Sequence, residues 1–162
     1  MYQKYYSSPI GLLKITCDEK SVLKITTTVE LEENTPNLIC DQAEEELRRY
    51  FKGELQSFNI PLKLNGSDFQ IQVWQELLNV PFGKTVSYQE LSNRIGKPKA
   101  IRAVANAVGA NKWLVVVPCH RIIGSDKTLT GFSAGLENKI KLLRLENHQI
   151  KINNNLKNSK LV

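Results

Sequence analysis

The chain has 162 residues, of which 41% are hydrophobic and 23% charged, and its formal net charge is +6. This composition is typical of globular domains and excludes disordered, fibrous and collagen-like proteins. No apolar stretch approaches the roughly 20 residues of a membrane span, and the first residues lack the pattern of a secretory signal. Three cysteines, an odd number, favour free thiols over a disulfide framework, so we expect a cytoplasmic protein with no membrane partner.

The charge is unevenly distributed along the chain. Residues 1–64 carry 8 basic and 10 acidic side chains, whereas residues 65–162 carry 14 basic and 6 acidic ones. A basic second part predicts a surface for a polyanion such as nucleic acid. From charge alone, a merely soluble basic protein is an equal alternative.

The first part of the chain has the pattern of a small sheet with one helix. Two β-prone runs, residues 10–17 and 22–28, flank a polar turn and predict a hairpin or meander. Apolar residues recur at helical spacing in residues 41–52, and Gly53 follows. Residues 54–66 are expected to be an extended connector.

The second part begins with helix signals. Ser67 and Gln70 form a capping box ahead of an apolar helical face, and Ser87 with Glu90 forms a second box ahead of a short helix. Pro98 suits the first turn of a further helix that runs to Gly109. Two short helices joined by a glycine-containing turn predict a helix-turn-helix.

The second helix of this pair is rich in small residues, and its Arg102 and Asn106 share one face. Small side chains permit close approach, either to a nucleic acid or to a neighbouring helix, and both interpretations stay open. The alanines in question are Ala100, Ala103, Ala105 and Ala107.

Downstream, we expect a β run at residues 113–117, a short strand at Ile122–Ile123, a glycine-containing loop at 131–135 and a helix at 136–147. Helical spacing puts Glu146 on the inward face of that last helix. The Asn- and Lys-rich residues 148–162 are expected to be a flexible tail. The predicted domains are therefore residues 1–65 and 66–147.

The chemistry centres on Cys119, which follows Pro118 and precedes His120. A thiol beside a proton acceptor, with Glu146 as an orienting acid, is the arrangement of a nucleophilic cysteine. The alternative is an inert core cysteine. Widely scattered cysteines and histidines give no metal-ligand spacing, so we expect no metal and no cofactor.

Four segments carry a resemblance to a known family. They read VPCHRII at Val117–Ile123, VSYQEL around Ser87-Tyr88, PKAIRAV at Pro98–Val104, and GFSAGLENKIKLLRLE at Gly131–Glu146. With these segments, the chain resembles the O6-alkylguanine-DNA alkyltransferases, strongly over residues 66–147 and more loosely towards the N-terminus.

The resemblance implies an α+β fold: a small ribonuclease H-like domain with a sheet and a helix, then a mostly helical domain with the helix-turn-helix. It implies DNA repair by single-turnover transfer of an alkyl group from O6-alkylguanine, with O4-alkylthymine as a further candidate substrate. The implied partner is double-stranded DNA, bound through its minor groove by a monomer that extrudes the damaged nucleotide.

The resemblance also implies roles for individual residues. Cys119 would accept the alkyl group, His120 would act as its base through a water, and Glu146 would orient the imidazole. Asn111 would be the hinge between the recognition helix and the active-site strand. Tyr88 would press on the flanking phosphate and donate to O6 of the leaving guanine.

DNA binding would fall to Arg102, which would fill the gap left by the extruded nucleotide, assisted by Ala103, Ala105, Asn106, Ala107 and Arg121. Ser133, Phe132 and Lys139 would belong to the base pocket.

Two other functions stay in view. A module that binds damaged DNA without repairing it lacks the cysteine in this family, so Cys119 argues against that function. A Cys-His hydrolase is disfavoured by the helix-turn-helix and by the lack of any signal for an acyl substrate.

Overall fold

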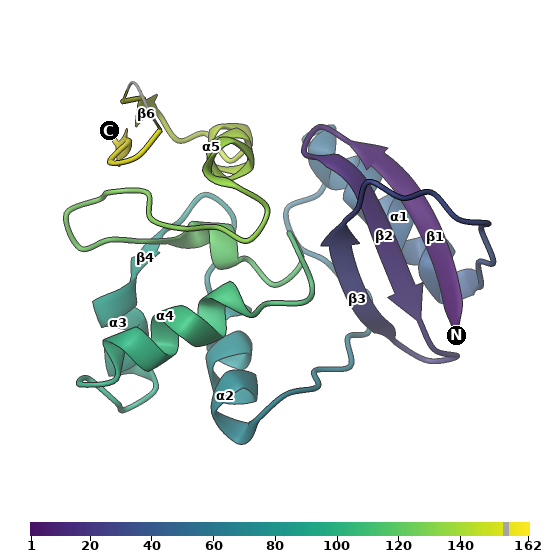
Figure 1. Cartoon of the computed structure of the whole chain (residues 1–162), viewed down its shortest axis with the longest axis horizontal. Coiled ribbons are helices and arrows are strands. Elements are labelled where there is room, and N and C mark those ends of the chain that lie inside the picture. Colours follow the sequence, from purple (N-terminus) through teal and green to yellow (C-terminus); the bar gives the residue numbers. More distant parts are fainter. Residues whose placement is uncertain (154–155) are drawn as a thin grey trace. The chain divides into compact units, whose positions relative to one another are not determined.

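The computed structural model describes residues 1–153 and 156–162, and the chain forms two compact units (Figure 1). The N-terminal unit comprises Met1–Asn65 together with Lys112–Leu114, and the C-terminal unit comprises Gly66–Asn111 and Val115–Val162. The first holds a sheet and a helix and the second is mostly helical, which confirms the predicted α+β class.

The N-terminal unit is built on an antiparallel sheet in the order β1-β2-β3. Along β2, Leu13, Ile15 and Cys17 are buried and alternate with partly exposed residues, as period-2 burial of one sheet face requires. The helix α1 begins after Asn37, whose side chain accepts from Cys40 N. The bounds are β1 Tyr2–Ser8, β2 Gly11–Cys17, β3 Val22–Thr27 and α1 Leu38–Phe51.

The predicted strand at residues 113–117 is wrong. Only Trp113 forms a bridge, with Ile25 of β3, while residues 114–116 form a turn in which Val115 has φ 72°. A β-branched residue whose backbone adopts the left-handed conformation interrupts an extended segment. The valines of this run are buried, so their apolar pattern reflects burial and not strand pairing.

Three helices form the first part of the C-terminal unit. The capping box of Ser67 and Gln70 starts α2 as predicted, and Ser87 accepts from Glu90 N at the start of α3. Trp74 Nε1 donates to the carbonyl of Ala107, 2.9 Å away, which ties α2 to α4. The bounds are α2 Asp68–Leu77, α3 Tyr88–Arg94 and α4 Ile101–Gly109, so α4 begins three residues after Pro98.

The remaining elements hold the segment around Cys119. The strand β4 (Val86–Ser87) pairs in parallel with β5 (Ile122–Ile123), which follows the short 3₁₀ helix Cys119–Arg121. The last helix, α5 (Leu136–Leu145), ends at Glu146, which is buried as predicted.

The expected flexible tail is corrected for the described residues. The strands β6 (Ile150–Lys151) and β7 (Lys160–Leu161) pair antiparallel. Ile150 joins a buried cluster that includes Ile140 and Leu143 of α5, and Leu156 and Leu161 pack against it. Apolar side chains spaced along a polar sequence therefore anchor this segment. Residues 154 and 155, within the predicted tail, lie outside the described residues.

Candidate active site

Cys119 lies at a cavity of about 740 Å³ in the C-terminal unit, and only 3% of the residue is exposed. Pro118 precedes the 3₁₀ turn that carries the cysteine, and Cys119 N donates to Val117 O at 2.8 Å. This tight turn fixes the backbone beneath the sulfur. The thiol is therefore buried in the protein yet reached from a defined cavity.

Asn111 connects the end of α4 to the cysteine turn. Its Nδ2 donates to the Cys119 sulfur at 3.1 Å and to Val117 O at 2.8 Å, and the residue is buried. One side chain thus fixes both the thiol and the backbone two residues before it.

Burial is the largest influence on the Cys119 thiol and raises its pKa. The Asn111 hydrogen bond and the charge of Lys139 act in the opposite direction, because both favour the thiolate. The site therefore keeps a thiol at rest and holds two groups ready to stabilise the thiolate.

His120, Arg121 and Glu146 form a buried network. His120 Nε2 donates to Glu146 Oε2 at 2.7 Å, and Arg121 donates to the same carboxylate through Nε at 2.7 Å and an Nη at 3.0 Å. Since a carboxylate only accepts, Nε2 carries the imidazole proton. In the described part of the chain, the buried His120 Nδ1 has no hydrogen-bond partner.

The network sets the charge of each member. Burial alone would raise the pKa of Glu146, but the hydrogen bonds from His120 and Arg121 outweigh it, so its pKa falls far below the usual range. Burial lowers the pKa of His120, opposed by Glu146. The resting site therefore contains a carboxylate and a neutral imidazole.

The predicted DNA contact by Arg121 is wrong. The side chain is buried and also donates to Val80 O at 2.7 Å, in addition to its two bonds to Glu146. A buried carboxylate needs a partner for its charge, and Arg121 supplies it.

Lys139 does not line the cavity, contrary to the prediction. It is fully buried, and its Nζ donates to Ile122 O at 2.6 Å and to Thr130 O at 3.5 Å. Burial lowers its pKa to about 8, opposed by Cys119. Lys139 therefore acts on the site through its charge and through the carbonyl groups that it binds.

The cavity itself brings together several predicted residues. Tyr88 from the start of α3, Arg102 and Asn106 from α4, and Phe132 and Ser133 from the following loop all line it. Ala105, which was expected at the DNA, also lines the cavity. Residues that were not predicted as site residues complete the lining: Ile101, Val108, Gly109, Thr130 and Gly131.

Thr130 is the most informative of the residues that were missed. Its Oγ1 donates to the Tyr88 hydroxyl at 3.0 Å, and its carbonyl accepts from Lys139. Burial raises the pKa of Tyr88, so the phenol stays protonated. The position of Thr130 just before the Gly131–Gly135 loop was the available signal.

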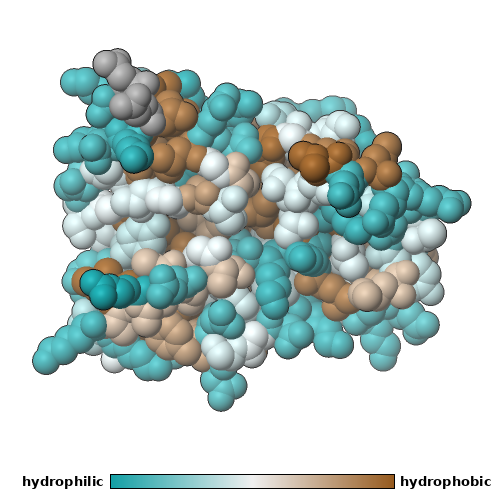
Figure 2. Space-filling view, viewed as in Figure 1, coloured by the Kyte–Doolittle hydropathy of each residue, from teal (hydrophilic) through white to brown (hydrophobic). Residues whose placement is uncertain are grey.

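The alanines of α4 divide between two roles. Ala103 is exposed and Ala105 partly so, whereas Ala107 is 3% exposed and carries the carbonyl bound by Trp74. Ala107 is therefore a packing residue, and its predicted DNA contact is wrong. Figure 2 shows hydrophobic and hydrophilic residues side by side on the face that carries α4.

Two kinds of feature are not seen in residues 1–153 and 156–162. They contain no group of three or more His, Cys, Asp and Glu side chains that could hold a metal ion. None of their helices is long and apolar enough to cross a membrane.

The helix pair α3–α4 and the hydrogen-bonded Cys119 both border the same cavity. This arrangement defines a class of protein that combines a nucleic-acid-binding helix-turn-helix with a nucleophilic thiol. Two family descriptions match the chain: the DNA-binding domain of 6-O-methylguanine DNA methyltransferase at residues 68–148, and its ribonuclease-like domain at residues 1–64. The chain belongs to the 6-O-methylguanine DNA methyltransferase family.

Individual relatives agree over most of the chain. It is 44% identical to a methylated-DNA–protein-cysteine methyltransferase of Haemophilus influenzae, over 90% of this chain and 86% of the relative. It is 38% identical to one of Methanosarcina barkeri, over 93% and 100%. The crystal structure of Mycobacterium tuberculosis OGT in complex with DNA superposes with a TM-score of 0.83 at 38% identity, covering 90% of this chain and 92% of that one.

Proposed function

We propose that Cys119 is the acceptor of the alkyl group in the reaction of this family. The chain is a DNA repair protein with methylated-DNA–protein-cysteine methyltransferase activity. The observation that carries the assignment of the acceptor is the position of the Cys119 sulfur at the cavity, within 3.1 Å of Asn111 Nδ2. Cys17 and Cys40 are buried in the N-terminal unit, and neither is among the residues that line the cavity.

The reaction is a displacement at carbon. The Cys119 sulfur forms a bond to the alkyl carbon of O6-alkylguanine, the bond between that carbon and O6 breaks, and the electron pair leaves with O6. The guanine then takes up a proton, and the thiol proton goes to His120. A thiolate is the competent nucleophile.

His120 suits the role of base because its imidazole is neutral. Nε2 is held by Glu146, so Nδ1 is the nitrogen available to take the proton, through a bridging water. The imidazolium that results lies 2.7 Å from a carboxylate. Glu146 thus orients the base and stabilises the charge that forms on it.

Lys139 assists by charge. Its ammonium and the Cys119 sulfur interact electrostatically, and in a buried site such an interaction is stronger than in water. Lys139 therefore stabilises the thiolate during attack. Tyr88, which remains protonated, donates a hydrogen bond to the leaving guanine at O6.

DNA binds through α3 and α4, with the minor groove against α4. An alkylated base inside a duplex is out of reach, so its nucleotide is extruded at a cost of a few kcal/mol. Arg102 is exposed at the cavity lining and fills the gap in the stack. Ala103, Ala105 and Asn106 face the groove, and Ser133 and Phe132 contact the extruded base.

The product is a thioether that water does not readily displace, so each protein molecule reacts once. One monomer therefore repairs one lesion. Because Cys119 must be a free thiol to react, we assign the protein to the reducing cytoplasm.

Intact-mass measurement after incubation with a duplex that contains O6-methylguanine tests the proposal. One methyl group should be added and should map to Cys119, and Cys119→Ala should remain unmodified while still binding the duplex. Binding by the natural protein without a change of mass would overturn the proposal in favour of a lesion-binding module. A methyl group on Cys17 or Cys40 would overturn the assignment of the acceptor.

A further inference from the structure

The C-terminal hairpin, described over residues 149–153 and 156–162, lies beyond the matched DNA-binding domain, which ends at residue 148. Its strands β6 and β7 pair through Ile150 with Leu161 and Lys151 with Lys160. No step of the proposed reaction uses this hairpin. Its apolar residues nevertheless pack into the unit that contains the cavity.

The hairpin is fixed to the segment that leads into the cavity loop. Leu129 N donates to Ser159 O at 2.8 Å, and Leu161 N donates to Lys127 O at 3.0 Å. The next residues, beginning with Thr130, line the cavity. The hairpin is therefore held a few residues from the site where the damaged base would bind.

The exposed charges of this region are mainly positive. Residues 147–162 contain no acidic residue, and Lys151, Lys157 and Lys160 are exposed, as is Lys127 on the adjoining turn. Among the described residues, none of these four lysines has an ion-pair partner.

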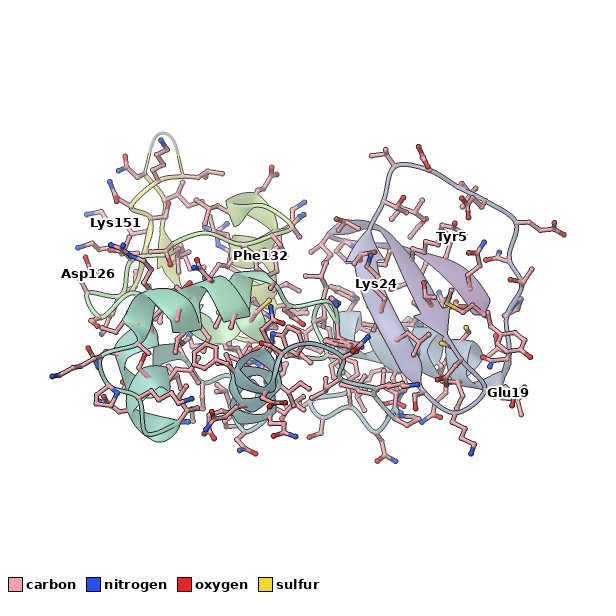
Figure 3. All side chains as sticks on the ribbon, turned by 60° about the horizontal axis from the view of Figure 1, so that its bottom comes forward. Tyr5, Glu19, Lys24, Asp126, Phe132 and Lys151 are labelled. Atoms are coloured by element: carbon pink, nitrogen blue, oxygen red, sulfur yellow. The ribbon has the colours of Figure 1, made fainter. Side chains whose placement is uncertain are left out.

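One acidic side chain, Asp126, lies in the adjoining turn, where Thr128 N donates to its Oδ1 at 3.0 Å. Figure 3 shows Asp126 and Lys151 at the same end of the C-terminal unit. Four lysines against one aspartate leave a net positive surface.

We propose that the lysines of the C-terminal hairpin bind backbone phosphates of duplex DNA beside the lesion. This inference rests on the proposed function, because the duplex must already be held at the cavity. Lysines that contact phosphates add affinity without sequence preference, which suits repair at any sequence. The attachment of the hairpin to the cavity loop favours DNA over an anionic membrane, since it links these charges to the site of the damaged base.

Charge removal without loss of the fold tests the inference. The variant K151Q/K157Q/K160Q keeps every backbone hydrogen bond of the hairpin. The control K20Q/K24Q/K52Q removes the same charge from exposed positions of the N-terminal unit. Binding to a duplex that contains O6-methylguanine is measured at several salt concentrations, with thermal unfolding as the check of folding.

We expect the hairpin variant to bind the duplex about tenfold more weakly at low salt. The slope of log affinity against log salt should become shallower by about 0.9 for each phosphate that the lysines no longer neutralise. The control should match the natural protein in slope. Equal slopes for the two triple variants would overturn the inference. It would also be overturned if the hairpin variant bound anionic lipid vesicles more weakly but bound the duplex as tightly as the natural protein.

A second readout separates this inference from the proposed function. Alkyl transfer from free O6-benzylguanine to Cys119, followed by mass, needs no DNA and should be the same in the hairpin variant and the natural protein. Failure of the natural protein to take up a methyl group from the O6-methylguanine duplex would overturn the proposed function. Intact transfer with unchanged DNA binding would overturn the role of the hairpin alone.

Discussion

Arg121 donates two hydrogen bonds to the carboxylate of Glu146, through Nε at 2.7 Å and an Nη at 3.0 Å, and both side chains are buried. Glu146 also accepts from His120. The Arg121 cation, next to Cys119 and His120 in the sequence, therefore keeps a buried carboxylate ionised, and that carboxylate holds the imidazole by a hydrogen bond. A basic residue in a basic region of the sequence acts inside the protein and not at its surface.

Arg121→Met is expected to lower the free energy of unfolding by about 3 kcal/mol, because removal of one partner leaves a buried carboxylate poorly compensated. The salt dependence of DNA binding should be unchanged, since Arg121 faces no phosphate. Chemical denaturation and a salt titration measure the two effects. A shallower salt slope with unchanged stability would contradict the structural role of Arg121.

The lowered pKa of Lys139 predicts that the effect of this residue on stability changes with pH. Its pKa is about 8 in the folded chain and near 10.5 in an exposed lysine, so between these values the unfolded state binds more protons and stability rises with pH. The free energy of unfolding of the protein with Lys139, measured relative to that of the Lys139→Met variant, should therefore rise by about 1.4 kcal/mol per pH unit in this window.

The comparison is best made in a Cys119→Ala background. Burial raises the pKa of Cys119, so in the folded state the thiol keeps its proton to higher pH than in the unfolded state. This makes stability fall with pH and opposes the rise that Lys139 causes. Urea unfolding at several pH values between 8 and 10 gives the difference. A constant difference across this range would exclude a buried lysine with a lowered pKa.

Local signals were enough to predict where α2 and α3 start. The capping box of Ser67 with Gln70 and the N-cap bond of Ser87 to Glu90 N join residues three positions apart, so the sequence contains each whole interaction. The strand β1 was missed because tyrosines, lysine and glutamine mask its alternation. The run of valines before Pro118 has strand propensity, but burial in a turn overrides that propensity.

The candidate site divides in a similar way. The Cys-His dipeptide after Pro118 and the helical spacing of Glu146 were enough to suggest Cys119, His120 and Glu146, and the structure brings them into one region. The partner of Arg121, Glu146, lies 25 residues further along the chain. The local sequence therefore showed a basic residue in a basic region but not the buried carboxylate that it binds. The hairpin was missed because Asn and Lys dominate its composition, while its apolar anchors are few and find their partners in α5.

Asn111→Ala should make the Cys119 thiol less reactive. The Asn111 amide lowers the pKa of this thiol, so its removal should move the pH profile of alkylation by iodoacetamide to higher pH. Asn106→Ala is the matched control, because Asn106 lines the same cavity, whereas the amide that donates to the sulfur is that of Asn111. Identical pH profiles of alkylation for the two variants would show that Asn111 does not stabilise the thiolate and serves only in packing.

Arg102→Ala should affect duplex repair more than transfer from a free base. Only the duplex leaves a gap in its base stack that a side chain can fill, and extrusion of a nucleotide costs a few kcal/mol. We expect the rate of repair of O6-methylguanine in a duplex to fall about tenfold or more, whereas transfer from free O6-benzylguanine should be nearly unchanged. Lys99→Ala, an exposed cation just before α4, controls for the removal of charge. Equal reductions on both substrates would show that Arg102 shapes the cavity and does not take the place of the extruded nucleotide.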